Sequence, residues 1–242
     1  IIWNVETASK ILIENPADII YHFVEKELQH TDIVDIQSWK EARNSSDIKL
    51  GFSVTDKIPS KDLLSKISEN SMIVPKFGVN GNLSFVSIKQ TYPTNAEDMV
   101  VLERDVIKFD LSCTPIQDIY TIVNVRYKKD YEEDEYKKQT GYCDSYDFYG
   151  NGDEGASHYY KYSYYGLKRE DNILEFESDY IRDRNSATKL RNLIAMHHCN
   201  RHTIVKLTLP IKYSNLEIGD IIKFDKVVNN LKSFGEDYTG NN

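Results

Sequence analysis

Three histidines and a cysteine stand close together near residue 200: His197, His198, Cys199 and His202. Imidazole and thiolate are common zinc ligands, so this group is the first candidate for a metal site. The spacing does not fit a common zinc site, because there is no HExxH motif and no second Cys/His pair at zinc-finger distance. Adjacent helical residues also point to different sides. We interpret the group as a helix C-terminus, where basic side chains suit the helix dipole, and expect no bound metal.

A second group has the oxygen-rich composition of a calcium-binding loop. Its members are Asp147, Asn151, Asp153 and Glu154. The EF-hand pattern fails, because Tyr149 stands where the second oxygen ligand belongs and His158 where the closing Glu belongs. A turn rich in Gly and Asp is the preferred interpretation.

Catalytic chemistry finds little support in the sequence. Glycoside cleavage needs two carboxylates facing each other, but 38 Asp and Glu residues make some such pair unavoidable. No GxSxG motif and no GxxxxGK[ST] motif occurs. We therefore expect a non-enzymatic protein with no catalytic residue and no cofactor.

Composition limits the class of protein further. The 242 residues are 40% hydrophobic and 28% charged, which is typical of a globular protein and long enough for two modest domains. The longest apolar runs, such as 11–13, are far too short to span a bilayer. A net charge of −8 with no basic stripe disfavours tight nucleic-acid binding.

The termini and the cysteines suggest the context. The chain starts on a strand-like run without Met and shows no signal peptide, so we expect a fragment of a longer protein. Cys113, Cys143 and Cys199 have unrelated spacings, which favours three free thiols over a disulfide framework.

Helical signals dominate the first third of the chain. Asn15 followed by Pro16 predicts a capped helix over residues 16–28, and a second helix is predicted over 36–42 with Trp39 facing inward. A third helix is predicted over 60–70, with Ser60 as its cap.

Strand signals accompany these helices. Residues 49–55 alternate like a strand. Asn80-Gly81 between the apolar runs 72–79 and 83–88 predicts a hairpin with a type I′ turn.

After Pro93 the pattern becomes strand-rich. Half-buried antiparallel strands are predicted over 107–111, 119–127, 173–176 and 203–209, and a turn at Gly219-Asp220 leads into 221–224. One helix, over 186–198, interrupts them. The segments 100–127 and 173–228 must pair, because neither alone offers enough strands to close a core.

The segment between Tyr127 and Tyr165 differs from the rest, since it holds 11 of the 17 tyrosines and carries a local charge of −4. Tyrosine gives large amphipathic contact area at low entropic cost, so we expect a projecting hairpin or partner-binding loop. The tyrosines expected at an interface are Tyr142, Tyr146, Tyr149, Tyr159, Tyr160, Tyr162, Tyr164 and Tyr165.

The predicted fold class is α+β, in which a compact α/β domain precedes a mainly antiparallel β-barrel domain with one helix and a long tyrosine-rich insert. The α/β domain is assigned to residues 14–99. The barrel is assigned to 100–228, with its insert at 128–170. Residues 1–13 are interpreted as the end of a preceding domain or a linker, and 229–242 as a linker or tail.

Several stretches resemble phage tail or baseplate hub proteins. Asn15-Pro16-Ala17-Asp18-Ile19-Ile20 looks like the start of the helix that follows the first barrel of that family. The runs 174–178 and 180–183, with the helix after them, look like its second barrel. The stretch 203–220 also looks like this second barrel. It ends in Leu216-Glu217-Ile218-Gly219-Asp220, which is similar to the LxxGD turn that closes the barrel in that family.

This resemblance covers residues 15–127 and 173–225 and leaves the tyrosine-rich insert without a counterpart. It implies a homotrimer at the tail tip, whose paired barrels match the hexameric tail tube on one side and a spike or tip protein on the other. The implied location is the virion tail, after synthesis in the bacterial host cytoplasm. The family's first barrel would lie before residue 1.

Two other functions stay open on the sequence alone. The tyrosine-rich loop suits a receptor- or glycan-binding module. The chain also suits a part of a tail-associated cell-wall hydrolase. A wide threefold assembly would favour the hub. An exposed tyrosine platform with bound sugar would favour the binding module, and a pocket with converging carboxylates would favour the hydrolase.

Overall fold

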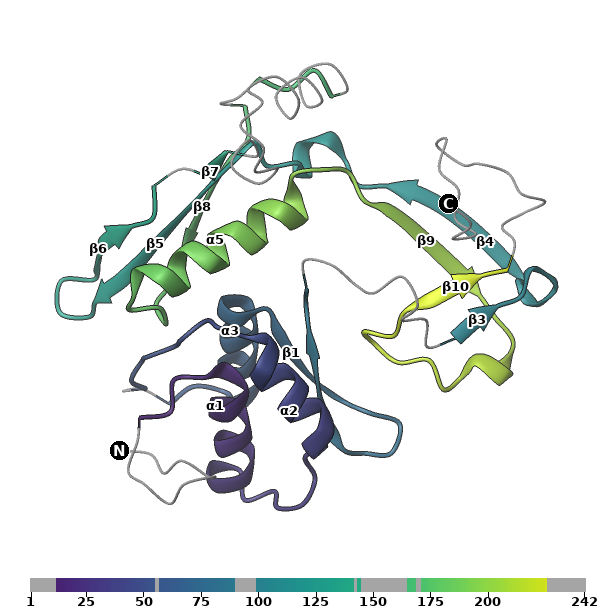
Figure 1. Ribbon diagram of the computed structural model, residues 1–242, viewed down its shortest axis with the longest axis horizontal. Helices are drawn as coiled ribbons and strands as arrows, with labels where there is room; N and C mark the ends of the chain where they lie inside the picture. The colour runs from purple at the N-terminus through teal and green to yellow at the C-terminus, as the bar shows by residue number, and fades with distance from the viewer. Residues whose placement is uncertain are drawn as a thin grey trace. The chain divides into compact units, whose positions relative to one another are not determined.

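The computed structural model combines helices with several small sheets (Figure 1). The residues that it describes are 12–54, 57–89, 99–141, 143–144, 165–168 and 171–225. Their contacts form two units. The larger unit contains the described residues between 12 and 89 and between 116 and 200, and the smaller unit contains residues 99–115 and 201–225.

The first helix of the larger unit starts where its capping residues predict. In α1 (Pro16–His22), proline opens the helix and Asn15 Oδ1 accepts a hydrogen bond from the Ala17 N–H at 3.0 Å. The π-helical turn η1 (Phe23–Glu27) continues it directly. The helix predicted over residues 16–28 is therefore confirmed.

The second helix is also confirmed and is longer than predicted. α2 (Ile36–Ser45) begins after Asp35, whose Oδ1 accepts from the Gln37 N–H at 3.0 Å. Trp39 is only 6% exposed, as the predicted inward orientation requires.

The third helix, α3 (Ser60–Ser71), confirms the predicted element but not its cap. Ser60 is the first helical residue, and Pro59 occupies the cap position without a side-chain hydrogen bond. The helix ends at Met72, whose φ of 57° lies in the left-handed region.

The strand predicted over 49–55 is wrong for its described residues, 49–54, which form no ladder. The Leu50 N–H donates to Glu14 O and the Gly51 N–H to Tyr180 O, both at 2.8 Å. Successive N–H groups thus bond to two different segments, so no single partner strand builds a ladder. The apolar pattern reflects burial, since Leu50 is 1% exposed.

The predicted hairpin is present with a different turn. β1 (Ile73–Phe77) pairs antiparallel with β2 (Leu83–Ser87), and the loop spans residues 78–82. Only Gly81 has a positive φ, of 80°, whereas a type I′ turn needs two. Asn80 instead uses its side-chain oxygen to accept from the Asn82 N–H at 2.9 Å, which stabilises the wider loop.

The second half of the larger unit is a small sheet beside a long helix (Figure 1). β5 (Ile122–Asp130) pairs with β6 (Glu135–Gln139), β7 (Cys143–Asp144) and β8 (Ile173–Glu177). β8 runs parallel to β5, which corrects the expected antiparallel pairing.

β5 is also more deeply buried than predicted. Ile122, Val123, Asn124 and Val125 are consecutive and all buried, so both faces of the strand are covered here. α5 (Arg184–His198) packs against β5, and Asp183 caps it by accepting from the Ser186 N–H at 2.9 Å. The predicted helix over 186–198 is confirmed.

One hydrophobic core joins the two halves of the larger unit. It includes Ile20 and Ile67 from the helices, Val125 from β5, and Leu190 from α5. The described residues between 116 and 200 therefore share a core with the predicted α/β domain, although the sequence assigned them to the second domain across a boundary at residue 99.

The smaller unit consists of two strand pairs. β4 (Lys108–Cys113) pairs antiparallel with β9 (Thr203–Thr208), and β3 (Met99–Val101) pairs parallel with β10 (Ile222–Phe224). The described parts of the segments 100–127 and 173–228 therefore pair as predicted, through β3–β10, β4–β9 and β5–β8. Of these three pairs, only β4–β9 is antiparallel, which corrects the expected mainly antiparallel arrangement.

The coarse fold class, mixed α and β, is confirmed. The described strands lie in four separate sheets, and within the described ranges they do not close a barrel.

Candidate functional site

The best-defined polar cluster lies where the tyrosine-rich insert leaves the sheet, at the β5–β6 hairpin. Its turn is set by Asp130, whose Oδ1 accepts from the Glu132 N–H at 3.0 Å. Lys128 has a φ of 59°, and its N–H donates to Ile181 O at 2.9 Å instead of joining the β5–β6 ladder. This kink ties the hairpin to the segment before α5.

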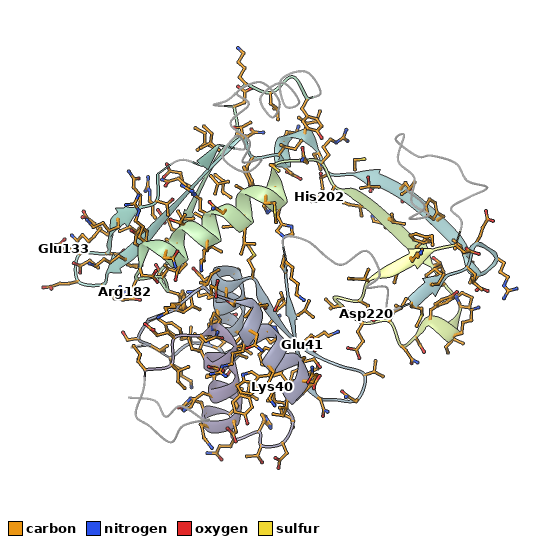
Figure 2. All side chains as sticks on the ribbon, viewed as in Figure 1. Lys40, Glu41, Glu133, Arg182, His202 and Asp220 are labelled. Carbon is orange, nitrogen blue, oxygen red and sulfur yellow. The ribbon has the colours of Figure 1, made fainter. Side chains whose placement is uncertain are left out.

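Asp179 lies at the centre of this cluster. Its carboxylate Oδ1 accepts from the Tyr136 hydroxyl at 2.6 Å and lies 3.4 Å from Lys129 Nζ. Its backbone carbonyl accepts from the Tyr131 hydroxyl at 2.9 Å. Arg182 stacks over the Tyr131 ring at 5.7 Å and donates to Lys129 O at 2.6 Å. Figure 2 shows Glu133 in the hairpin and Arg182 on the adjoining segment.

Electrostatics keep this cluster in one protonation state near neutral pH. Burial, and then the hydrogen bond to Asp179, raise the pKa of Tyr136. Burial also raises the pKa of Tyr131. The hydrogen bond to Asp134 raises the pKa of Lys129. Both phenols therefore remain donors and Lys129 remains a cation, so the cluster acts as a fixed clamp rather than as an acid–base pair.

An open groove of about 660 Å³ borders the clamp. Its lining carries both charge signs and consists of Arg126, Lys129, Asp134, Glu135, Tyr136, Lys137, Lys138, Gln139 and Glu177. Arg126 forms ion pairs with Glu175 and Glu177. Such a surface suits a polar protein partner better than a ligand of one charge sign.

Most of the tyrosines predicted at an interface lie outside the described residues. These are Tyr142, Tyr146, Tyr149, Tyr159, Tyr160, Tyr162 and Tyr164. Tyr165 is described and is half-buried. The calcium-like group at 147–154 also lies outside the described part.

The first three tyrosines of the segment have structural roles. Tyr127 is buried at 5% exposure, and Tyr131 and Tyr136 bind Asp179. The sequence did not predict the role of Asp179, because it lies 43 residues from Tyr136.

His197, His198 and Cys199 end α5 as predicted, whereas His202 lies beyond the helix, where its N–H donates to Thr114 Oγ1 at 3.0 Å. His197 and His198 form its last turn, and the His198 ring lies 5.4 Å from the Tyr120 ring. Among the residues that the structure describes, no three His, Cys, Asp or Glu side chains are grouped to hold a metal ion. Cys113 and Cys199 are free thiols.

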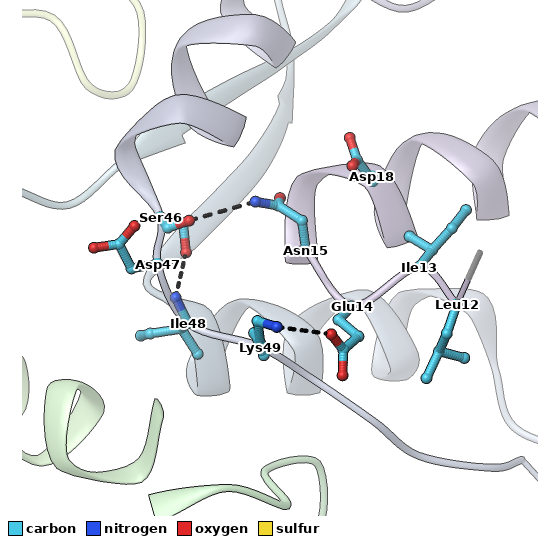
Figure 3. A pocket seen from close by; sticks show the side chains of 9 residues that line it. All are labelled: Leu12, Ile13, Glu14, Asn15, Asp18, Ser46, Asp47, Ile48 and Lys49. Carbon is cyan, nitrogen blue, oxygen red and sulfur yellow. Dashed lines mark hydrogen bonds and ion pairs between the residues drawn. The ribbon is translucent and has the colours of Figure 1, made fainter. Parts of the chain in front are cut away.

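A hollow of about 320 Å³ lies at the N-terminus of α1 (Figure 3). Asn15 caps α1 and donates to Arg43 O at 3.1 Å, and Glu14 pairs with Lys49 at 3.0 Å. Asp47 pairs with Lys189 at 2.9 Å. These polar groups hold the segment 46–49 against α1, so the residues around the hollow stabilise the fold.

No protein-family model matches the chain, and no curated protein sequence matches it. Within the described ranges, no helix is long and apolar enough to cross a membrane. The candidate site is therefore defined by its own residues alone. It consists of the Asp179 clamp and the polar groove at the base of the tyrosine-rich insert.

Proposed function

We propose that this chain is a structural component of a phage tail tip or baseplate hub. In this role it assembles with copies of itself into a threefold ring, which joins the tail tube to the distal tip or spike. The proposal combines the resemblance of residues 15–127 and 173–225 to tail hub proteins with one observation on the smaller unit.

That observation is the incomplete burial of the β4–β9 ribbon. The register pairs Phe109 with Leu207 and Leu111 with Val205, so these four side chains share one face. All four are only half-buried, although Phe109, Val205 and Leu207 already pack against the small core of this unit. A two-stranded ribbon is at best marginally stable alone and gains stability when its apolar face is covered.

The described core of this unit is correspondingly small. It contains three buried hydrophobic residues, Val101, Tyr213 and Phe224. A unit with so few buried side chains gains much of its stability from association, because a neighbouring surface removes more apolar area from water. We therefore infer that the strands β3, β4, β9 and β10 belong to a barrel-like domain that is completed in the assembled ring.

The base of the tyrosine-rich insert supports a second contact. The Asp179 clamp fixes the hairpin from which the insert continues, and a rigid base lowers the entropy lost when a projecting segment binds. We assign the insert, with its tyrosines, to docking of a neighbouring subunit or tail protein.

Light scattering after size-exclusion chromatography tests the proposal. Over about 1 to 100 μM, a range that spans common dissociation constants of specific assemblies, we expect a species of three times 28.1 kDa. A mass of one chain throughout that range would contradict the proposed ring.

A further inference from the structure

The loop between β1 and β2 holds two neighbouring groups that can react with each other without an enzyme. Asn80 carries a side-chain amide, and Gly81 follows it with a backbone nitrogen that can act as a nucleophile. Attack of this nitrogen on Cγ of Asn80 closes a succinimide ring. The hairpin therefore places a possible self-modification site at its turn.

Glycine leaves the path of this attack open. A side chain at position 81 would hinder the reaction, because its β carbon is bonded next to the attacking nitrogen. Both Asn80 and Gly81 are exposed to solvent. Apart from the chain neighbours, no described residue comes within 4 Å of the place where a β carbon would stand on Gly81. Water, which hydrolyses the succinimide, therefore reaches both residues.

A hydrogen bond polarises the amide that is attacked. Asn80 Oδ1 accepts from the Asn82 N–H at 2.9 Å, so the side chain lies along the stretch of backbone that contains the Gly81 nitrogen. Negative charge develops on this oxygen during the attack. A backbone N–H that already points at the oxygen stabilises that charge, which favours ring closure.

Local opening of the turn releases the nucleophile. The Gly81 N–H donates to Gly78 O at 2.9 Å, and this proton must leave before the nitrogen can attack. Val79, on the same turn, is 72% exposed, so the turn buries little apolar surface. Exposed turns of this kind open at a small cost in free energy, and a base from the solvent then takes the proton.

We propose that Asn80 is a site of spontaneous deamidation in the folded protein. The Gly81 nitrogen forms a bond to Cγ of Asn80, the bond from Cγ to Nδ2 breaks, and Nδ2 leaves as ammonia after taking up a proton. Water then opens the ring at either carbonyl and gives aspartate or isoaspartate, with no change in oxidation state. Each event adds one negative charge to a chain whose net charge is −8.

The two products differ in their effect on the hairpin. Aspartate keeps an oxygen that accepts from the Asn82 N–H. Isoaspartate carries the main chain through its side-chain carbon, so it lengthens the loop that the bond from Gly78 N–H to Asn82 O closes at 2.8 Å. The modification does not depend on the proposed hub function.

Asn82 is a matched control within the same loop. It is followed by Leu83, whose side chain hinders attack and whose N–H donates to Ile33 O at 2.7 Å. On incubation at mildly alkaline pH, we expect Asn80 to convert at least about tenfold faster than Asn82. Peptide mapping by mass spectrometry measures both rates, ion-exchange chromatography follows the added charge, and circular dichroism confirms that the chain stays folded.

Two variants test the roles of the two residues. Gly81→Ala places a β carbon beside the nitrogen and should slow conversion of Asn80 at least about tenfold. Because Gly81 has a φ of 80°, alanine also strains the turn, so Asn80→Asp serves as a second variant that leaves Gly81 in place. It should elute with the aged acidic form of the parent.

Three results would overturn the proposal. In the first, Asn80 stays unchanged in the folded chain while a proteolytic peptide that contains it converts, which would show that the loop protects it. In the second, Asn82 converts as fast as Asn80. In the third, Gly81→Ala converts at the rate of the parent, which would show that glycine does not open the path of attack.

Discussion

Asp179 shows how one side chain organises the start of the tyrosine-rich insert. It accepts from Tyr136 through its carboxylate and from Tyr131 through its backbone, and its side chain is 33% exposed. A hydrogen bond to a charged acceptor contributes more than one to a neutral acceptor. The two tyrosines should therefore differ in importance although both lose only a hydroxyl on replacement by Phe.

We predict that Tyr136→Phe lowers the free energy of unfolding by about 1 to 2 kcal/mol, and that Tyr131→Phe lowers it by less than about 1 kcal/mol. Urea denaturation followed by tyrosine fluorescence measures both values. Equal losses in the two variants would show that the charge of Asp179 adds nothing to the clamp.

Local residue roles could be predicted where the signal lies in neighbouring positions. Asn15 with Pro16 fixed the start of α1, and the helical spacing around Trp39 indicated its burial. The Asp179 clamp could not be predicted in this way, because its bonds span 43 and 48 residues. Spacing carries no information on partners at such separations.

At the scale of elements, the turns η2 (Glu103–Asp105) and η6 (Ile211–Tyr213) depend on the ion pair of Asp105 with Lys212. The hydrogen bond from Lys212 lowers the pKa of Asp105, and the bond to Asp105 raises the pKa of Lys212. The contribution of Asp105 is present above the ordinary carboxyl pKa of about 3.9 and is lost as pH falls through its lower folded value. The contribution of Lys212 is present below about 10.4 and is lost as pH rises through its higher folded value.

The contribution of this ion pair to folding should therefore be constant over the neutral range and weaken only below about pH 4 or above about pH 10.4. We predict that Asp105→Asn lowers the melting temperature at pH 7, because the uncharged amide holds Lys212 less firmly. Thermal unfolding of both proteins across pH measures this. A variant that melts like the parent would show that the turns keep their shape without the ion pair.

The insert offers a test with two nested deletions. Residues 130–139 form the hairpin and carry Tyr131 and Tyr136, whereas residues 145–164 lie beyond β7. We predict that replacing 145–164 by a short Gly/Ser linker changes the free energy of unfolding by less than about 1 kcal/mol but weakens assembly with tail partners. Deleting 130–164 should instead cost more than about 3 kcal/mol, because it also removes two strands from the sheet around β5. Thermal unfolding of both variants decides the matter, and similar melting temperatures would contradict the structural role given to the hairpin.

Strand positions could largely be predicted, but strand direction and partner could not. Alternation located β4 and β9 well. The same pattern cannot show that β8 runs parallel to β5, because periodicity reports which face is buried and not which strand lies alongside. The hairpin of β1 and β2 was predicted because its signal, Asn80-Gly81, is local.

For the whole molecule, the charge of −8 opposes any assembly of identical copies. Salt screens this repulsion, since the Debye length falls from about 10 Å at 0.1 M to about 3 Å at 1 M. An apolar contact between copies is not weakened by salt. We predict that self-association tightens by about threefold to tenfold between about 0.05 and 0.5 M NaCl. A dissociation constant that rises with salt would point instead to ion pairs as the main contact.

The smaller unit is built from two segments, 99–115 and 201–225, which are separated in the chain by part of the larger unit. During synthesis, β3 leaves the ribosome long before β10, the strand it must pair with. At about 5 to 20 residues per second this wait lasts on the order of ten seconds.

The larger unit has all of its described segments once residue 200 has emerged, so it can fold first. The hydrogen bond from Tyr213 to Asp105 joins the two segments of the smaller unit and thus forms only after residue 213 has left the ribosome. Translation itself therefore sets an order of folding, in which the larger unit precedes the smaller one.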